Sequence, residues 1–290
     1  MPYDLRHVRF AGAERRPAAS RLQAALAAGG VVAPDEYPRS QLIRRALERL
    51  GLNADAYRAQ PLQRRLAACL RALQAPSEEA ALAALEHKAT LWDTAADALL
   101  VGVTSFFRDT PVFEAIRTNV LPALASRRRI RVWSAACSTG GELYSVAMLL
   151  GEARLLDRAD LLGTDCRPAA VREAEEGYLD PSVAGEVDAA LRAKYLEDTP
   201  AGPRVCASLR RRARWKVADL LGRLEDGPWD IILWRNSAMY LATAESDRLF
   251  AGLVSKLTAG GYLIVGKAER PPSGVPLATV ARCIYRTRGA

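Results

Sequence analysis

Histidine is scarce in this chain, which has 290 residues but only two histidines. Both of them, His7 and His87, lie in the first third of the sequence. Histidine is the commonest general base at neutral pH and a frequent metal ligand. Histidine-based hydrolysis and multi-histidine metal catalysis are therefore poor hypotheses for the rest of the chain.

Paired cysteines and long apolar runs are also absent. The five cysteines are dispersed and form no Cys-x-x-Cys pair, which indicates reduced thiols and gives no zinc signature. No apolar run approaches the roughly 20 residues that span a bilayer, and residues 1–21 show no secretion signal. We therefore expect a cytoplasmic, monomeric protein with no metal site and no membrane insertion.

The charge is unbalanced toward the positive. Lysine and arginine number 41 against 33 aspartates and glutamates, a net charge of +8 with a pI near 9.5. This predicts an anionic partner: an acidic protein surface, a nucleic acid or a membrane face. Arginine runs at 127–131 and 210–214 have no interleaved aromatic residues for base stacking, so we do not expect nucleic acid.

Residues 1–100 are predicted to form a small all-α N-terminal domain. Glycine and proline interrupt residues 1–40, which we expect to be partly mobile. Pro61 suits a first helical position, and leucines then recur at spacings of three and four. Ser77 is a candidate N-cap, followed by Glu78 and Glu79 and a single helix over residues 80–100.

After residue 100 the pattern changes to short apolar strands alternating with helices. This predicts an α/β domain over residues 101–290, with a doubly wound, mostly parallel sheet covered on both faces. Residues 183–195 are helix-prone, and residues 283–286 are expected to form a last antiparallel edge strand. The expected parallel strands are 131–135, 161–164, 215–218, 230–234 and 261–266.

Two features at predicted strand ends suggest a nucleoside site. Residues 134–142 form a loop of small residues that lacks the G-x-G-x-x-G pattern of a dinucleotide cradle. Asp165 ends the next strand, about 25 residues beyond Gly140, near the spacing of a ribose-binding carboxylate. A ribose clamp without a phosphate cradle fits S-adenosylmethionine (SAM). Alternatively, the glycines only turn the chain and Asp165 caps a helix.

Four motifs occur in order: Thr104-Ser-Phe-Phe-Arg-Asp109, residues 132–145, Gly163-Thr-Asp165 and Trp234-Arg-Asn-Ser-Ala-Met-Tyr240. From about Leu50 to Arg286 the chain resembles the CheR family of chemotaxis methyltransferases. The resemblance implies a Rossmann-like methyltransferase sheet and SAM-dependent methylation of glutamate side chains of chemoreceptors, with S-adenosylhomocysteine (SAH) as product. It also implies that residues 101–290 are the SAM-binding catalytic domain, with a small inserted subdomain at about 177–214.

The resemblance also implies roles for individual residues. Asp165 would bind the ribose hydroxyls, and Glu142 and Arg108 would bind the methionine part of the cofactor. Our hypothesis is that one of these two residues contacts the ammonium group and the other contacts the carboxylate. Asp219 and Leu220 would face the adenine. The cofactor-binding set is Thr104, Arg108, Ala136, Glu142, Asp165, Asp219, Leu220, Arg235 and Asn236, and the catalytic set is Arg108 and Tyr240. As structural alternatives, Asn236 caps a helix, Tyr240 is a half-buried core residue and Arg108 pairs with Asp109.

The family chemistry needs no general base. A glutamate side chain has an ordinary pKa of about 4.3 and is already nucleophilic at neutral pH. In the family, a basic N-terminal helix meets acidic receptor helices, and Arg64, Arg65 and Arg71 stand in the corresponding helix here. A solvated charged face is the alternative for these arginines.

Some motif positions differ from the family pattern. The family loop Gly-Glu-Glu-Pro reads Gly140-Gly-Glu-Leu143 here, and Gly-His-Ser-Glu reads Gly266-Lys-Ala-Glu269. Cofactor positions are mostly kept while the substrate side is altered. The acceptor thus stays open between a chemoreceptor glutamate and another protein or small acidic metabolite. A non-catalytic SAM-binding regulatory protein is a further alternative. The positive net charge alone suggests a last one, an RNA methyltransferase.

Overall fold

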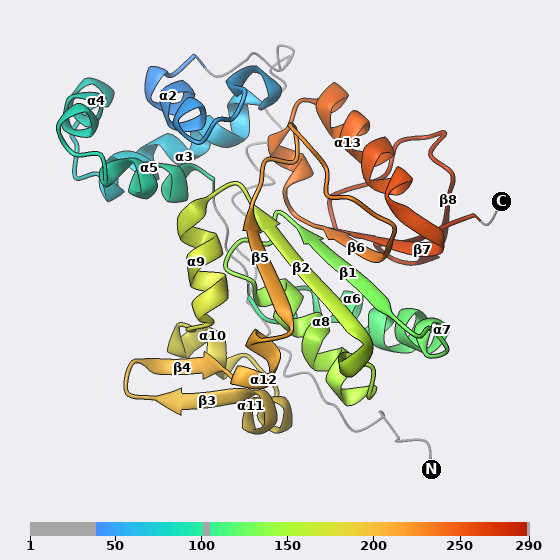
Figure 1. Ribbon diagram of the computed structural model, residues 1–290. Helices are drawn as coiled ribbons and strands as arrows, with labels where there is room; N and C mark the ends of the chain where they lie inside the picture. Colours follow the sequence, from blue (N-terminus) through green and yellow to red (C-terminus); the bar gives the residue numbers. More distant parts are fainter. Residues whose placement is uncertain (1–38, 101–104, 289–290) are drawn as a thin grey trace, which may run out of the picture.

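The N-terminal part of the fold is a group of short helices. A computed structural model describes residues 39–100 and 105–288 (Figure 1), so the expected mobility of residues 1–40 falls almost entirely outside the described chain. These helices are α2 (Gln41–Arg49), η2 (Ala54–Ala56), α3 (Ala59–Ala72), α4 (Glu78–His87) and α5 (Leu91–Leu99).

Side-chain caps begin two of the four α-helices in this group. The Ser40 hydroxyl accepts the Ile43 N–H at 3.1 Å, and the Ser77 hydroxyl accepts the Ala80 N–H at 3.2 Å. The expected single helix over residues 80–100 is wrong, because Lys88 takes an extended conformation (φ −137°, ψ 94°) that ends α4. The break lets α5 fold back against α3 and α2. Pro61 lies at the third position of α3, within the first turn, where a missing N–H breaks no helical bond.

The rest of the described chain is built on a seven-stranded sheet in the order β5-β2-β1-β6-β7-β9-β8. Strands β5, β2, β1, β6 and β7 pair in parallel, which confirms the expected doubly wound, mostly parallel sheet. The strands are β1 (Ile130–Ala135), β2 (Ala159–Asp165), β5 (Ala213–Val217), β6 (Trp229–Trp234), β7 (Leu257–Val265), β8 (Leu277–Ala281) and β9 (Ile284–Thr287).

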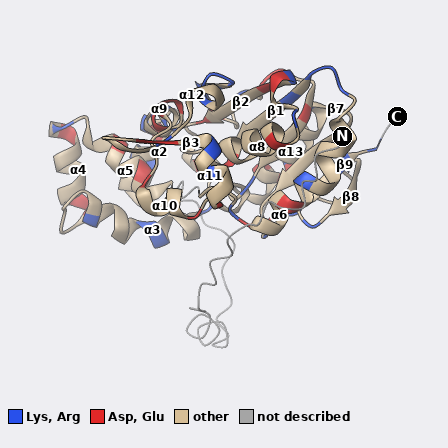
Figure 2. Ribbon diagram, turned by 90° about the horizontal axis from the view of Figure 1, so that it is seen from below, with Lys and Arg blue, Asp and Glu red and all other residues tan. Residues whose placement is uncertain are grey.

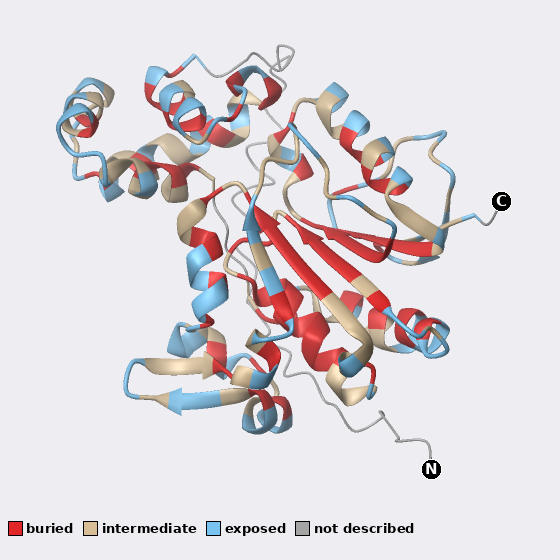
Figure 3. Ribbon diagram, in the orientation of Figure 1, coloured by how far each residue is buried: buried red, intermediate tan, exposed pale blue. Residues whose placement is uncertain are grey.

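Helices flank this sheet, and its central strands are buried (Figure 3). Helix α8 packs on β1 and β2, α9 on β2 and β5, and α13 on β7. The chain runs from β1 outward to β2 and β5, then returns to β6 on the other side of β1, so the order switches between β1 and β6. The helices and turns are α6 (Thr110–Ala115), η3 (Ile116–Val120), α7 (Leu121–Leu124), α8 (Gly141–Glu152), η4 (Leu156–Arg158), α9 (Pro168–Glu176), η5 (Ala238–Tyr240) and α13 (Thr243–Ser255).

The C-terminal strands differ from the prediction. Residues 284–287 do form an antiparallel strand, β9, but it lies between β7 and β8. The edge strand is therefore β8, which the sequence analysis did not predict. Three prolines and a glycine at 271–276 precede β8 and obscure its short apolar pattern.

A small subdomain is inserted between α9 and β5 (Figure 1). It contains two short helices where one helix-prone segment was expected over 183–195. Asp180 and Asp188 each cap a new helix, and this breaks the segment. Its elements are α10 (Pro181–Gly185), α11 (Ala189–Tyr195), β3 (Leu196–Thr199), β4 (Gly202–Val205) and α12 (Ala207–Arg210).

Backbone hydrogen bonds join the N-terminal helices to the segment after β6. Tyr57 and Leu241 form an antiparallel bridge. The Arg58 N–H donates to the Tyr240 carbonyl at 2.9 Å, and the Ala242 N–H donates to the Ala56 carbonyl at 2.8 Å. The helical region is thereby fixed next to Tyr240.

Candidate active site

A cavity opens at the carboxyl ends of β1, β2, β5 and β6, beside the point where the strand order switches. Ligands of open α/β sheets bind at this place. Nine of the residues predicted from the sequence line this one cavity, although they come from segments far apart in the chain. They are Arg108, Ala136, Glu142, Asp165, Asp219, Leu220, Arg235, Asn236 and Tyr240. The tenth, Thr104, lies outside the described residues.

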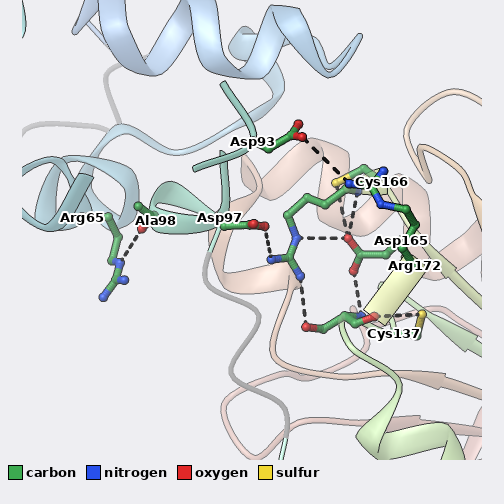
Figure 4. A network of polar contacts seen from close by, with 10 residues as sticks. Arg65, Asp93, Asp97, Ala98, Cys137, Asp165, Cys166 and Arg172 are labelled. Carbon is green, nitrogen blue, oxygen red and sulfur yellow. Dashed lines mark hydrogen bonds and ion pairs between the residues drawn. The ribbon is translucent and has the colours of Figure 1, made fainter. Parts of the chain in front are cut away.

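Asp165 ends β2 and is 5% exposed. Its Oδ2 accepts the Ser138 N–H at 2.8 Å, and its Oδ1 accepts the Arg167 backbone N–H at 3.0 Å and the Arg167 Nε–H at 3.2 Å (Figure 4). A carboxylate offers about four acceptor sites. Oδ2 therefore keeps an acceptor position for a further donor.

The loop after β1 turns sharply beside Asp165. Ala136, Ser138 and Gly140 all have positive φ, at 60°, 52° and 84°. A Cβ atom at Gly140 would lie 2.6 Å from Cη2 of Trp215, so glycine is required both by the backbone conformation and by the ring above it. This turn starts helix α8 and places Glu142 in its first turn.

Glu142 belongs to a chain of alternating charges that includes Arg235, the residue directly after β6. Its Oε1 accepts the Ser134 hydroxyl at 2.8 Å, and its Oε2 lies 3.1 Å from Arg235 Nη1. Arg235 Nη2 lies 3.0 Å from Asp109 Oδ2, and Asp109 Oδ1 lies 2.5 Å from Lys267 Nζ. Asp109 thus pairs with Arg235 and Lys267, and Arg235 is the direct ionic partner of Glu142.

The remaining predicted residues lie around the cavity wall. Arg108 is exposed and Tyr240 is half-buried. Asn236 has a φ of 60° and does not cap a helix through its side chain. Asp219 Oδ1 accepts the Leu221 N–H at 2.9 Å in a local turn, while the Leu220 N–H has no acceptor among the described residues.

Glu269 is a structural residue of the site that the sequence analysis noted only as a motif position. It is 5% exposed, and its carboxylate accepts the backbone N–H groups of Asn236 and Ala238, both at 2.8 Å, and of Gly266 at 2.7 Å. Burial raises the pKa of Glu269 above its ordinary value, and these N–H bonds oppose the shift. Glu269 therefore fixes the loop that carries Arg235 and Asn236.

Tyr57 was missed by the sequence analysis. It lines the cavity from the N-terminal helical region and is 8% exposed. Burial raises the pKa of the Tyr57 phenol, and the acidic groups of Cys166, Asp219 and Asp165 raise it further. Tyr57 is more than a hundred residues from Asp165 in the sequence, and no local motif marks it.

Two further properties concern residues 39–100 and 105–288. Within these ranges no three histidine, cysteine, aspartate or glutamate side chains gather as metal ligands. No helix within them is long and apolar enough to span a membrane.

Known proteins match this chain over most of its length. The family described as "CheR methyltransferase, SAM binding domain" matches residues 102–279. A chemotaxis protein methyltransferase of Listeria monocytogenes serovar 1/2a is 30% identical over 205 residues, which cover 69% of this chain and 78% of that protein. One of Listeria innocua serovar 6a is 26% identical over 240 residues, which cover 81% and 92%.

A solved structure, the N-methyltransferase NodS from Bradyrhizobium japonicum WM9 in complex with SAH, is similar with a TM-score of 0.32 and 16% identity, over 55% of this chain and 63% of that one. The strand order, the cavity at the strand ends and the family match over residues 102–279 lead to one conclusion. The chain belongs to the CheR family of SAM-dependent methyltransferases.

Proposed function

We propose that this methyltransferase transfers the methyl group of SAM to glutamate carboxylates of an acidic protein of the chemoreceptor type. The observation that carries the proposal is the composition of the cavity wall. Among the described residues that line the cavity there is no histidine and no lysine. An acceptor that is already ionised at neutral pH needs no general base, and a glutamate carboxylate meets that requirement.

The wall residues fit the cofactor at three points. Asp165 keeps an acceptor position for ribose, and the Leu220 N–H is available to an adenine nitrogen. The Ser237 hydroxyl is buried without a hydrogen-bond partner among the described residues, and Ser237 also lines the cavity. We assign the methionine part to the end of the cavity that holds Glu142, Arg235 and Arg108. When bound, SAM supplies an electrophilic methyl group on a sulfonium.

Arg108 and Tyr240 are proposed to orient the acceptor carboxylate. Arg108 is exposed at the cavity wall, so its guanidinium can meet an incoming anion. Tyr240 is held by the hydrogen bond from the Arg58 N–H to its carbonyl. Orienting an acceptor in line with a donor can lower a barrier by several kcal/mol.

The proposed docking surface for the acidic partner is the basic face of α3. Arg64 and Arg71 are exposed on this helix, whose basic segments are visible in Figure 2. Arg65 is half-buried, and its Nε–H donates to the Ala98 carbonyl at 3.2 Å. The positive charge of the whole chain favours approach of the same class of partner.

Incubation of the protein with methyl-labelled SAM and chemoreceptor cytoplasmic fragments tests the acceptor. We expect label on glutamate that is released by mild base, as a methyl ester would be. Label that resists base would refute carboxylate methylation. Titration with SAH in a calorimeter tests the cavity separately, and an Asp165→Ala variant is expected to bind SAH at least tenfold more weakly.

A different acidic acceptor is the second candidate. Lys267 occupies the position where the family motif has histidine, is half exposed and pairs with Asp109. A cation at this place alters the substrate side while the cofactor side keeps its residues. SAH binding together with no label on receptor fragments, and label on another protein or acidic metabolite, would favour this candidate.

A further inference from the structure

Arg167 occupies an unusual position beside the cavity, because its guanidinium contacts three separate segments of the fold. Its Nε–H donates to Asp165 Oδ1 at 3.2 Å, and its Nη2 donates to the Ser138 hydroxyl at 3.0 Å. Its Nη1 lies 3.0 Å from Oδ1 of Asp97, on helix α5 of the N-terminal region. Figure 4 shows these contacts around Asp165 and Asp97.

Arg167 links Asp97 to Asp165, and we call these two contacts the bridge. The side chain of Arg167 is only 8% exposed, and the planar guanidinium offers its donors in fixed directions. Burial by itself lowers the pKa of Arg167, but the charges of Asp165 and Asp97 raise it by more, so the group stays positive. Asp165 is buried beside Arg167, with its side chain 6% exposed, so loss of this pair would leave an uncompensated buried charge. The Asp97 side chain is 41% exposed and contributes the third contact of the guanidinium.

The same bridge continues toward the basic face of α3. Asp97 is followed by Ala98, whose carbonyl accepts the Nε–H of Arg65 at 3.2 Å. Arg65 belongs to the helix that we propose as the docking surface for an acidic partner. One turn of α5 therefore contacts both the docking helix and, through Arg167, the carboxylate assigned to ribose.

We propose that Arg167 is a positioning residue that fixes Asp165 for the ribose, and that Asp97 holds Arg167 in place. Cofactor affinity then depends on how α5 of the N-terminal helices is seated on the catalytic domain. This inference rests on the proposed assignment of Asp165 to the ribose. It adds that the helical region regulates the cofactor site as well as carrying the docking surface.

Calorimetric titration of variants with SAH tests the bridge. Asp97→Ala and Arg167→Lys are each expected to weaken SAH binding by about tenfold. The double variant is expected to lose no more affinity than the single variant with the larger loss, because both substitutions break the same contact. The matched controls are Asp93→Ala and Arg172→Ala. These residues form an ion pair between α5 and α9 at 4.0 Å, with side chains 56% and 62% exposed. The controls are expected to change affinity by less than about twofold.

A second measurement separates positioning from general stability. The 2′-deoxy derivative of SAH lacks one ribose hydroxyl, so its loss of affinity relative to SAH reports on the Asp165 contact. We expect this loss to be clearly smaller in the Arg167→Lys and Asp97→Ala variants than in the original protein, because a displaced Asp165 gains less from the hydroxyl. A variant that only loosens the fold would leave the ratio of the two affinities unchanged, and that result would overturn the proposal.

The remaining outcomes are also decisive. Unchanged SAH affinity in Asp97→Ala would refute the bridge. Tighter SAH binding in Arg167→Lys would refute positioning as well, since Arg167 would then compete with the ribose for Asp165. Unchanged affinity in Asp165→Ala would instead refute the ribose assignment, and so identify a failure of the proposed site from which the bridge was inferred.

Discussion

The carboxylate of Glu269 accepts the backbone N–H of Asn236 at 2.8 Å, across 33 residues of sequence. The same Oε2 atom accepts the Gly266 N–H at 2.7 Å, so the ends of β6 and β7 are joined by one buried side chain. A Cβ atom at Gly266 would lie 2.8 Å from this oxygen. The close approach is possible only with glycine.

Replacement of Glu269 tests this relationship. Glu269→Gln places an amide group where two oxygens meet three N–H donors, and we expect a loss of about 2 kcal/mol in the free energy of unfolding. Urea denaturation measures it, and SAH affinity is expected to fall as the Asn236 loop loosens. The control is Glu245→Gln, which breaks only an exposed pair with Arg248. Equal effects in the two variants would contradict the prediction.

Arg235 holds two carboxylates together inside the protein. Its side chain is 2% exposed, between Glu142 and Asp109. Arg235→Met leaves both without their buried cation, and we expect a destabilisation of about 3 kcal/mol by urea denaturation. Lys267→Met removes a half-exposed partner of Asp109 and should cost less than about 1 kcal/mol. A reversed order of the two effects would count against this assignment.

The Tyr57 hydroxyl has no hydrogen-bond partner among the described residues, although the side chain is buried at the cavity. Tyr57→Phe should therefore leave the free energy of unfolding nearly unchanged. It should weaken SAH binding several-fold if the hydroxyl contacts the nucleoside. Calorimetry and urea denaturation on the same variant separate the two effects, with the exposed Tyr178→Phe as control. Unchanged SAH affinity would show that the Tyr57 hydroxyl does not contact the nucleoside.

Cys166 lines the cavity, and burial, followed by the charge of Asp165, raises the pKa of its thiol from 9.0 to about 12. Only the thiolate alkylates rapidly. At pH 8 the folded protein should therefore be modified at Cys166 by iodoacetamide roughly 1,000-fold more slowly than the urea-unfolded chain, which mass spectrometry of peptides measures. Comparable rates in the two states would contradict the shift.

The raised pKa of Cys166 also makes the free energy of unfolding depend on pH. Between pH 9 and 12 the unfolded thiol loses its proton while the folded thiol keeps it. The unfolded state then binds fewer protons, so stability falls as the pH rises through this window. Cys166→Ala should flatten that part of the profile, and an unaltered profile would argue against a raised pKa.

The exposed arginines of α3 give the partner prediction. The double variant Arg64→Ala, Arg71→Ala should weaken association with an acidic receptor fragment about tenfold at low salt, and less at high salt because exposed charges are screened. Surface plasmon resonance measures the association, and SAH affinity should not change. Arg128→Ala, Arg211→Ala removes the same charge from exposed positions elsewhere and is the control. Equal losses of affinity in the two double variants would mean that net charge, and not the position of the arginines on α3, determines binding.

Local patterns predicted those parts of the fold that depend on neighbours in sequence. The Ser77 cap, the strands that end at Ala135 and Asp165 and the loop at Gly140 could be predicted because each depends on a few adjacent residues. The break at Lys88 and the order of β8 and β9 could not, since packing against α3 and pairing with β7 decide them.

The sequence by itself determined the alternation of strands and helices, and with it the parallel sheet whose carboxyl ends gather Asp165, Glu142 and Asn236. Only the tertiary structure decided which distant side chains complete that site. Tyr57, Asp97 and Glu269 reach it across long separations in the chain, and such contacts follow from helix docking and sheet register, which no local spacing encodes. Arg167 and Asp165 are near neighbours in the sequence, whereas Asp97, which also pairs with Arg167, comes from helix α5, 70 residues away.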